Sequence, residues 1–294
     1  MTRRAQAMTV YVVALLAWSW FVGIPNDPAG VIIWIWFGTL AWDGLGDPWQ
    51  FWKDWWKPLL LLVVYWLVRG LADEIGIAPH YSMPIRFDEW LFGGTTPTVT
   101  LQHAWCGNPC TNDGPPHWWD FVLTTVYASH FLVALTLAGV LWVRDRMEWV
   151  RWLRRYITLL FCGLAIYIVY PMAPPWMASR DGYLPEVHRI TKLGWSSLEF
   201  HGVDLHRQTM VMFGMGNKVA AMPSLHCGIA CLVALYGISR LRSPFRWLLL
   251  LYPLAMALAL TYFAEHYVVD AIAGCLLALL VMIGVGRWER KRAA

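Results

Sequence analysis

The chain has 294 residues, of which 58% are hydrophobic and only 14% are charged. A soluble globular domain carries about 25% charged residues, so this composition excludes an ordinary soluble protein and indicates a polytopic membrane protein. The net charge of +4 does not indicate nucleic-acid binding, because the basic residues stand in short clusters between apolar runs.

The chain opens with three apolar runs, each shorter than the roughly 20 apolar residues that a membrane-crossing helix needs. The first lacks a small-residue cleavage site and is expected to be a retained span. The second is short for a full crossing and could also be re-entrant or interfacial. A tryptophan-rich stretch, residues 49–57, has the pattern of an interfacial amphipathic segment. The three runs are 8–24, 30–42 and 57–72.

Five longer apolar runs follow, interrupted by two long loops. The loops are too rich in Trp, Leu, Phe and Pro for disorder, and we expect them to fold as short interfacial helices. We predict one domain, residues 1–294, that forms an all-α polytopic membrane bundle of about six to eight transmembrane helices. The runs are 119–143, 155–171, 222–239, 246–264 and 267–287, and the loops are 72–118 and 172–221.

Positive charge sets the expected orientation. With eight spans, all four basic clusters fall on one face, which the positive-inside rule makes cytoplasmic. We therefore expect a plasma-membrane protein with both termini in the cytoplasm and both long loops on the exoplasmic face. The clusters are Arg3 with Arg4, Arg144 to Arg155, Arg240 to Arg246, and Arg287 to Arg292.

Two of the six cysteines, Cys106 and Cys110, share a loop. They are placed for a local disulfide if that loop faces an oxidising compartment. His103 and His117 lie nearby, but the spacing matches no standard zinc pattern. The remaining cysteines lie in apolar runs and are expected to be packing residues.

The string Pro-Ser-Leu-His at residues 223–226 stands where an apolar run begins. Pro223 suits a first helical turn, so Ser224 and His226 are expected in that turn, beside backbone N–H groups that no helix carbonyl receives. Such a helix start is a ready anion site. Because this run starts at the predicted exoplasmic face, the site is expected to face outside.

The string His-Tyr-Val-Val-Asp at residues 266–270 stands at the start of the last apolar run. His266 and Asp270 are four residues apart and are expected on one helix face, with the carboxylate directed back toward the imidazole. A carboxylate on one ring nitrogen fixes the tautomer and leaves the other nitrogen as a nucleophile or base. Ionisable residues at such places in a membrane indicate function.

Two histidines and an aspartate at the same predicted depth suit phosphoryl transfer in two steps. His266 would attack phosphorus and form a phosphohistidine supported by Asp270, while His226 would protonate the leaving oxygen and then activate the acceptor. No metal or other cofactor is needed if cations and helix N–H groups hold the phosphate. The candidate cations on the predicted exoplasmic side are Arg180, Arg189, Lys192, Arg207 and Lys218.

These residues resemble the motifs of the type 2 phosphatidic acid phosphatase (PAP2) superfamily of membrane lipid phosphatases and phosphotransferases. Residues 223–226 match its second motif, Pro-Ser-Gly-His, with Leu in place of Gly, and His266 with Asp270 matches the end of its third motif, His-x₃-Asp. The resemblance implies a catalytic core over residues 119–287, preceded by N-terminal spans and a first exoplasmic loop in 1–118. It also implies His266 as nucleophile, Asp270 as its orienting group and His226 as acid and base.

Two parts of the family pattern are missing. Leu260 stands where the third motif has Arg, and the first motif, Lys-x₆-Arg-Pro, has no match. Arg180 stands near the expected place of that motif and is our first candidate for the phosphate cation, although it could also be an interfacial anchor. Lys218 and Ser224 are further phosphate-binding candidates. The Leu in the second motif and the bare His-Tyr-x-x-Asp string are more similar to the inositol phosphorylceramide synthase and sphingomyelin synthase branch, which moves a phospho-headgroup between lipids.

We therefore expect an inositolphosphotransferase-like membrane enzyme that acts on a lipid-linked phosphate at the outer membrane face and passes the phospho-group to an alcohol or to water. A lipid-phosphate or polyprenyl (pyro)phosphate phosphatase is the nearest alternative. A non-catalytic scaffold or transporter with a degenerate site is an alternative of another class. The sequence does not define the lipid, the acceptor or the oligomeric state.

Several of these residues also have purely structural interpretations. Ser224 could be a helix cap, and His130, inside an apolar run, could be a buried histidine satisfied by local contacts. Glu265 is expected among lipid headgroups. Arg69 and Asp73 are four residues apart at the end of a span and are expected to form an ordinary ion pair.

Overall fold

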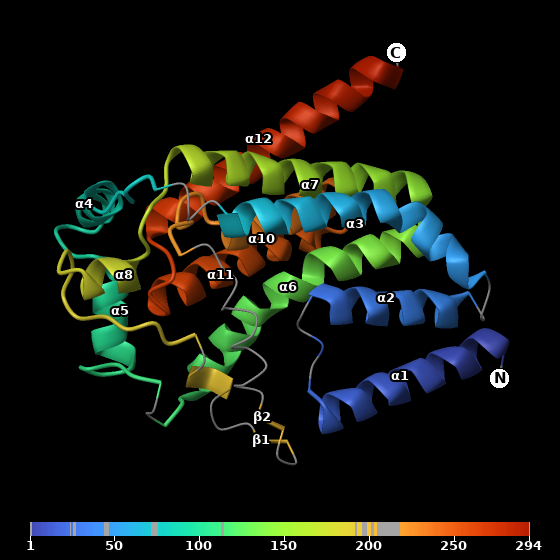
Figure 1. The fold of residues 1–294 in the computed structure, drawn as a ribbon, viewed down its shortest axis with the longest axis horizontal. Helices are drawn as coiled ribbons and strands as arrows, with labels where there is room; N and C mark the ends of the chain where they lie inside the picture. The colour runs from blue at the N-terminus through green and yellow to red at the C-terminus, as the bar shows by residue number, and fades with distance from the viewer. Residues whose placement is uncertain are drawn as a thin grey trace.

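The computed structural model of the chain describes residues 2–23, 25, 28–43, 47–71, 76–112, 115–191, 193–195, 199–200, 203–204 and 218–293. Over these residues the protein is an α-helical bundle, which confirms the predicted fold class (Figure 1). The strands β1 (Glu199–Phe200) and β2 (Val203–Asp204) form a two-residue antiparallel pair. The bundle helices are α1 (Arg3–Phe21), α2 (Pro28–Trp42), α3 (Pro48–Leu71), α6 (Trp118–Arg144), α7 (Arg146–Val169), α10 (Leu225–Arg240), the 3₁₀ helix η3 (Pro244–Leu250), α11 (Leu251–Tyr262) and α12 (Val268–Ala293).

Helix α3 differs from the sequence-based expectation of two pieces. Residues 49–57 and the following apolar run form one continuous helix, with Pro58 in its interior. A proline inside a helix removes one ladder hydrogen bond and bends the axis. Figure 1 shows α3 bending along its length. The break in the hydrophobic pattern thus corresponds to a bend rather than to the end of a helix.

Three helical segments in the described part of the chain are long and apolar enough to cross a membrane: α7, η3 with α11, and α12. The two halves of α6 are bent by 50° and make a fourth segment if they form one span. Residues 30–42 of α2 and the whole of α10 are shorter apolar helices. The protein is therefore a multi-pass membrane protein, and the expected number of six to eight crossings stays a prediction.

Helices α10 and α12 cross at close range because glycines meet at their contact. A Cβ atom built on Gly274 would lie 2.1 Å from the carbonyl oxygen of Ser224, and one built on Gly228 would lie 3.1 Å from the carbonyl oxygen of Gly274. Small residues allow membrane helices to approach in this way. The crossing brings together the starts of the two helices, where both sequence motifs stand.

The other end of α12 is tied to α7. The Glu289 carboxylate lies 2.8 Å from Arg155 Nη2 and 3.2 Å from Arg154 Nη1. Arg155 is buried, with 5% of its surface exposed, so this contact is better shielded from solvent than a surface ion pair. Helix α12 is therefore held at both ends of its length.

Short helices lie in the described parts of the two long loops, as expected, and their interfacial position stays a prediction. Figure 1 shows α4, α5 and α8 together at one end of the bundle, and α4 packs against the start of α12. Two isolated β-bridges, from Met172 to His80 and to Ala220, join three loop segments at this end. The helices are α4 (Ser82–Leu91), α5 (Pro97–Trp105), α8 (Pro175–Arg180) and the 3₁₀ helix η2 (Leu193–Trp195).

Candidate active site

The start of α10 places His226 in its first turn. Ser224 is the N-cap: its side chain accepts a hydrogen bond from the Cys227 N–H at 3.3 Å, as N-cap serines do. Pro223 precedes the cap, so the expectation that it occupies the first turn is wrong. Its carbonyl accepts a hydrogen bond from the Tyr167 hydroxyl at 2.7 Å instead. The Ser224 N–H donates to the Asp270 carbonyl at 2.9 Å, which joins the two motifs directly.

His266 lies before α12 rather than on it, because the helix begins at Val268. The expected shared helix face is therefore wrong, yet the pair forms: His266 Nδ1 lies 3.5 Å from Asp270 Oδ2. The same carboxylate oxygen accepts a hydrogen bond from the Tyr267 N–H at 2.9 Å. Both side chains are buried, with His266 4% and Asp270 0% exposed. The carboxylate thus holds the imidazole from the helix start.

The imidazoles of His226 and His266 face each other. His226 Nδ1 lies 3.3 Å from His266 Nε2, although the residues are 40 positions apart. Since Asp270 occupies the Nδ1 side of His266, the Nε2 atom is the one left for chemistry. The two nitrogens that the two-step scheme needs therefore meet in one place.

Two further aromatic residues, which the sequence reasoning did not assign to the site, come from α6. The ring of His130 lies 4.3 Å from that of His226, and the ring of Tyr127 stacks on His226 at 5.2 Å. Arg69 of α3 interacts electrostatically with His130 and His226. Helical spacing of three between the α6 residues is the sequence signal that they share a face.

A cation reaches the site from the second long loop. Arg189 forms an ion pair with Glu265, the residue beside His266. It also interacts with the Tyr127 hydroxyl, and Tyr127 stacks on His226. Glu265 is 8% exposed, so the expectation that it lies among lipid headgroups is wrong: Arg189 neutralises it inside the protein. Arg189 therefore contacts the neighbours of both histidines.

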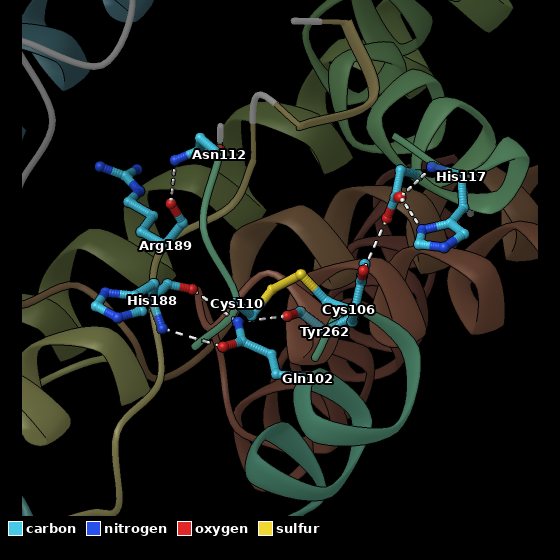
Figure 2. The surroundings of a disulfide bond; sticks show 9 residues. Gln102, Cys106, Cys110, Asn112, His117, His188, Arg189 and Tyr262 are labelled. Carbon is cyan, nitrogen blue, oxygen red and sulfur yellow. Dashed lines mark hydrogen bonds and ion pairs between the residues drawn. A yellow bond between two sulfur atoms is a disulfide. The ribbon is translucent and has the colours of Figure 1, made fainter. Parts of the chain in front are cut away.

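Side-chain amides hold the backbone that carries Arg189 (Figure 2). Gln102 of α5 donates to the His188 carbonyl at 2.7 Å and to the Tyr262 carbonyl at 2.9 Å, and its own oxygen accepts from the His188 N–H at 3.0 Å. Asn112 donates to the Arg189 carbonyl at 2.9 Å. Gln102 is 1% exposed, so these bonds are shielded from water.

Cys106 and Cys110, whose pairing the sequence left open, form a disulfide, with 5.3 Å between the Cα atoms. It lies between Gln102 and Asn112 in the chain, beside the segment that carries Arg189 (Figure 2). No group of three or more His, Cys, Asp or Glu side chains within the described ranges is arranged to hold a metal ion.

The remaining predicted cations lie elsewhere. Arg180 ends α8 and pairs with Asp181 at 2.7 Å, with 60% of its side chain exposed. The Arg180 guanidinium and the Tyr81 hydroxyl hold the pKa of Asp181 below its usual value. Lys218 is exposed at the start of the segment that leads to Pro223. Lys192, Arg207 and Asp73 lie outside the described residues, so the Arg69–Asp73 pair is not described.

The fold and the site together define the class of protein to which the chain belongs. An all-α membrane protein that presents two facing imidazoles, one of them held by a carboxylate, has the parts for transfer of a phospho-group through histidine. A family model described as the PAP2 superfamily matches residues 101–284. That range is more than half of the chain and includes both motifs, and the chain belongs to the PAP2 superfamily.

Three curated relatives are similar to the chain. Phosphoinositol dihydroceramide synthase of Bacteroides thetaiotaomicron is 26% identical over 246 residues, which is 76% of this chain and 75% of that protein. The catalytic subunit of inositol phosphorylceramide synthase of Schizosaccharomyces pombe is 28% identical over 142 residues, 45% of this chain and 31% of the relative. Inositol phosphorylceramide synthase of Candida albicans is 30% identical over 140 residues, 43% of this chain and 26% of the relative.

The chain thus spans less than a third of the length of each fungal relative. No solved structure matches the chain significantly. The family and its relatives confirm the resemblance seen in the sequence and identify an enzyme of the phosphotransferase or phosphatase type.

Proposed function

We propose that this protein is a phosphotransferase that moves phosphoinositol from a donor lipid to a lipid alcohol of the dihydroceramide type, through a covalent intermediate on His266. The observation that carries the proposal is the 3.3 Å approach of His226 Nδ1 to His266 Nε2, with Asp270 on the other side of His266. The name of the bacterial relative, which matches three quarters of both chains, supports phosphoinositol as the group transferred.

In the first step, His266 Nε2 attacks the phosphorus of the donor phosphodiester, and the bond from phosphorus to the lipid oxygen breaks. Protonated His226 delivers its proton to that oxygen. Asp270 stabilises the positive charge that develops on His266. In the second step, neutral His226 accepts the proton of the acceptor hydroxyl, whose oxygen attacks phosphorus and releases His266. Each half-reaction is a single displacement at phosphorus. Covalent catalysis lowers the barrier by dividing one difficult transfer into two easier steps.

The contact between the imidazoles must open for this chemistry. A reacting atom stands about 3–3.5 Å from its nucleophile, and a proton donor lies about 2.6–3.2 Å from the oxygen that it protonates. A phosphate between the two rings therefore needs more than the observed 3.3 Å. We propose that the donor phosphate replaces the direct contact between the imidazoles, and that the acceptor later takes the place of the released lipid.

Cations and backbone N–H groups hold the phosphate in this proposal. The first turn of α10, after the Ser224 cap, offers N–H groups at the positive end of the helix dipole. Arg189 is favoured as the phosphate cation because it contacts Glu265 and Tyr127, which flank His266 and His226. Arg180 and Lys218 are retained as candidates for headgroup contacts at the site entrance. The exposure of both residues suits that place better than the buried centre.

We place the reaction at the outer face of the membrane, with both termini in the cytoplasm, because the basic clusters follow the positive-inside rule in an eight-span topology. Membrane-impermeant thiol labelling of single cysteines introduced at Arg86 and at Arg292 tests this orientation. Labelling of intact cells at the first position and not at the second supports it, and the reverse pattern overturns it.

A transfer assay tests the function itself. Purified full-length protein in mixed micelles receives a donor lipid labelled in its inositol and a dihydroceramide acceptor. Transfer predicts a new labelled lipid. Labelled inositol phosphate in its place means hydrolysis of the donor phosphodiester and overturns transfer. Release of inorganic phosphate from a lipid phosphomonoester, measured alongside, would instead identify a lipid-phosphate phosphatase.

Variants identify the nucleophile in the same assay. His266→Ala should abolish both turnover and the label that stays on protein after an alkaline quench, whereas His103→Ala, at an exposed histidine of α5, should change neither. Full activity in His226→Ala and His266→Ala would overturn the mechanism and favour a scaffold or transporter.

A further inference from the structure

The first turn of α12 is capped by a residue from a distant part of the chain. Asp88, in α4, accepts hydrogen bonds from the N–H groups of Val268 at 2.9 Å and of Val269 at 3.1 Å. The first N–H groups of a helix have no partner within that helix. A carboxylate is the side chain that suits them best, since it accepts two bonds and carries charge of the favourable sign.

Asp88 shares the helix start with the residues of the proposed mechanism. Asp270 accepts from the Tyr267 N–H, so the two carboxylates together take up the N–H groups of residues 267, 268 and 269. His266 precedes these residues directly. The direction of the Asp270 carboxylate and the position of the His266 backbone therefore both depend on how this turn is held.

Packing fixes Asp88 in this position. Its side chain is 0% exposed. Ile85 of α4 belongs to one apolar cluster with Ala178, Tyr267 and Val269, which seals the contact between α4 and α12. Loss of the carboxylate would leave two N–H groups without an acceptor in a closed space, and a buried unsatisfied donor costs about 1–3 kcal/mol. Movement of the turn is the way to relieve that cost.

We propose that Asp88 is a positioning residue for the His266–Asp270 pair, acting by capping the first turn of α12 from α4. The proposal rests on the function proposed above, and it adds a residue outside the 101–284 range that the family model matches.

Acid should weaken this cap. Burial raises the pKa of Asp88 to about 6, and the neighbouring Asp270 carboxylate adds to that effect, while the two N–H bonds oppose it. At the start of α12, the ionisable groups that interact with Asp88 are Asp270, in the first turn, and the hydroxyl of Tyr267, which precedes the helix. On α4 its nearest charged neighbours in sequence are Arg86 and Glu89. A protonated carboxyl group keeps only one good acceptor oxygen, so the turn is held less firmly below about pH 6.

The pH dependence of the free energy of unfolding has the opposite sign to that of activity. The pKa in the folded protein lies above the ordinary value of 3.8, so the folded state binds this proton more readily than the unfolded state. The contribution of Asp88 to stability is therefore greatest below about pH 3.8 and is lost as the pH rises through about 6. Activity should fall on acidification while this part of the stability rises. A residue that is only structural would not produce that divergence.

The test compares Asp88→Ala and Asp88→Asn with Glu89→Gln, which removes a half-buried carboxylate from the next position of the same helix. The transfer assay is run from pH 5 to 8, per amount of folded protein, with His266→Ala alongside. Asp88→Ala should lower kcat by about 10²-fold, the cost of a displacement near 1 Å, with KM changed less. Asp88→Asn keeps one acceptor oxygen, so its kcat should lie between those of the wild type and Asp88→Ala. Its pH profile should also lack the part of the fall in activity on acidification that occurs near pH 6. Glu89→Gln should match the wild type.

The outcomes separate this proposal from the function that it rests on. Loss of activity in His266→Ala with wild-type kcat and pH profile in both Asp88 variants would overturn the positioning role alone. Activity in His266→Ala would overturn the proposed function itself. If Asp88→Ala does not fold, the kcat and pH profile of Asp88→Asn decide the matter.

Discussion

Gly274→Ala is the most direct test of how the site is assembled, because it acts on the crossing of α10 and α12 without touching an ionisable group. The new Cβ would lie 2.1 Å from the Ser224 carbonyl oxygen and 3.1 Å from the Gly228 nitrogen, whereas ordinary van der Waals contact begins near 3.4 Å. Both nearby atoms belong to backbone, so a side-chain rotation cannot relieve the clash.

The helices must therefore separate by about 1 Å, which is enough to lower kcat by about 10²-fold when it displaces reacting groups. The hydrogen bond from the Ser224 N–H to the Asp270 carbonyl, at 2.9 Å, is lost or lengthened as they part. Overpacking of this kind also costs roughly 1–3 kcal/mol of stability. The assay is phosphoinositol transfer at saturating donor, normalised to folded protein from the thermal unfolding profile.

Gly284→Ala is the matched control, since nothing lies within 4 Å of a Cβ built at that position of the same helix. The control should keep wild-type kcat and gain up to about 1 kcal/mol from the better helix propensity of alanine. Equal kcat in the two alanine variants would refute the inference that this close crossing aligns the two histidines.

Three other substitutions test the surroundings of the site. Asp270→Asn removes the charge that orients His266 and should lower kcat by roughly 10²–10⁴-fold with little change in KM, as measured in the transfer assay; an unchanged kcat would mean that the carboxylate is only a cap. Arg189→Ala should raise the KM for the donor lipid more than it lowers kcat, and titration of the donor at fixed acceptor separates the two. Gln102→Glu replaces an amide that donates to two carbonyls by a group of the same shape that cannot donate while it is ionised. The substitution should lower the free energy of unfolding by about 1–3 kcal/mol, as measured by thermal unfolding in detergent.

The histidine motifs could be found from sequence because their signals are local. Pro-Ser-Leu-His and His-x₃-Asp are short strings at the start of apolar runs, and charge patterning predicts both starts on one face of the membrane. The close approach of His226 and His266 then followed from topology alone. The exact starts of the two helices could not be predicted in the same way. Ser224 is the N-cap of α10, and His266 precedes α12, because the capping interactions decide where each helix begins.

The residues that the sequence did not assign lack such local signals. Tyr127 and His130 stand inside an apolar run, where an aromatic ring is ordinary core material. Arg189 was one of five cations in a long loop, and only tertiary contacts distinguish it from Arg180. Asp88 meets the N–H of a residue 180 positions away, a separation that no pattern in a single sequence reports.

The tie between Glu289 and the arginines of α7 bears on how substrate enters. Helix α12 is hydrogen-bonded to α4 at its first turn and ion-paired with α7 near its last. Contacts at both ends oppose tilting of the helix. If the donor phosphate binds beside His266 as proposed, we expect the room for it to come from rotation of the His226 ring and from movement of the Arg189 side chain.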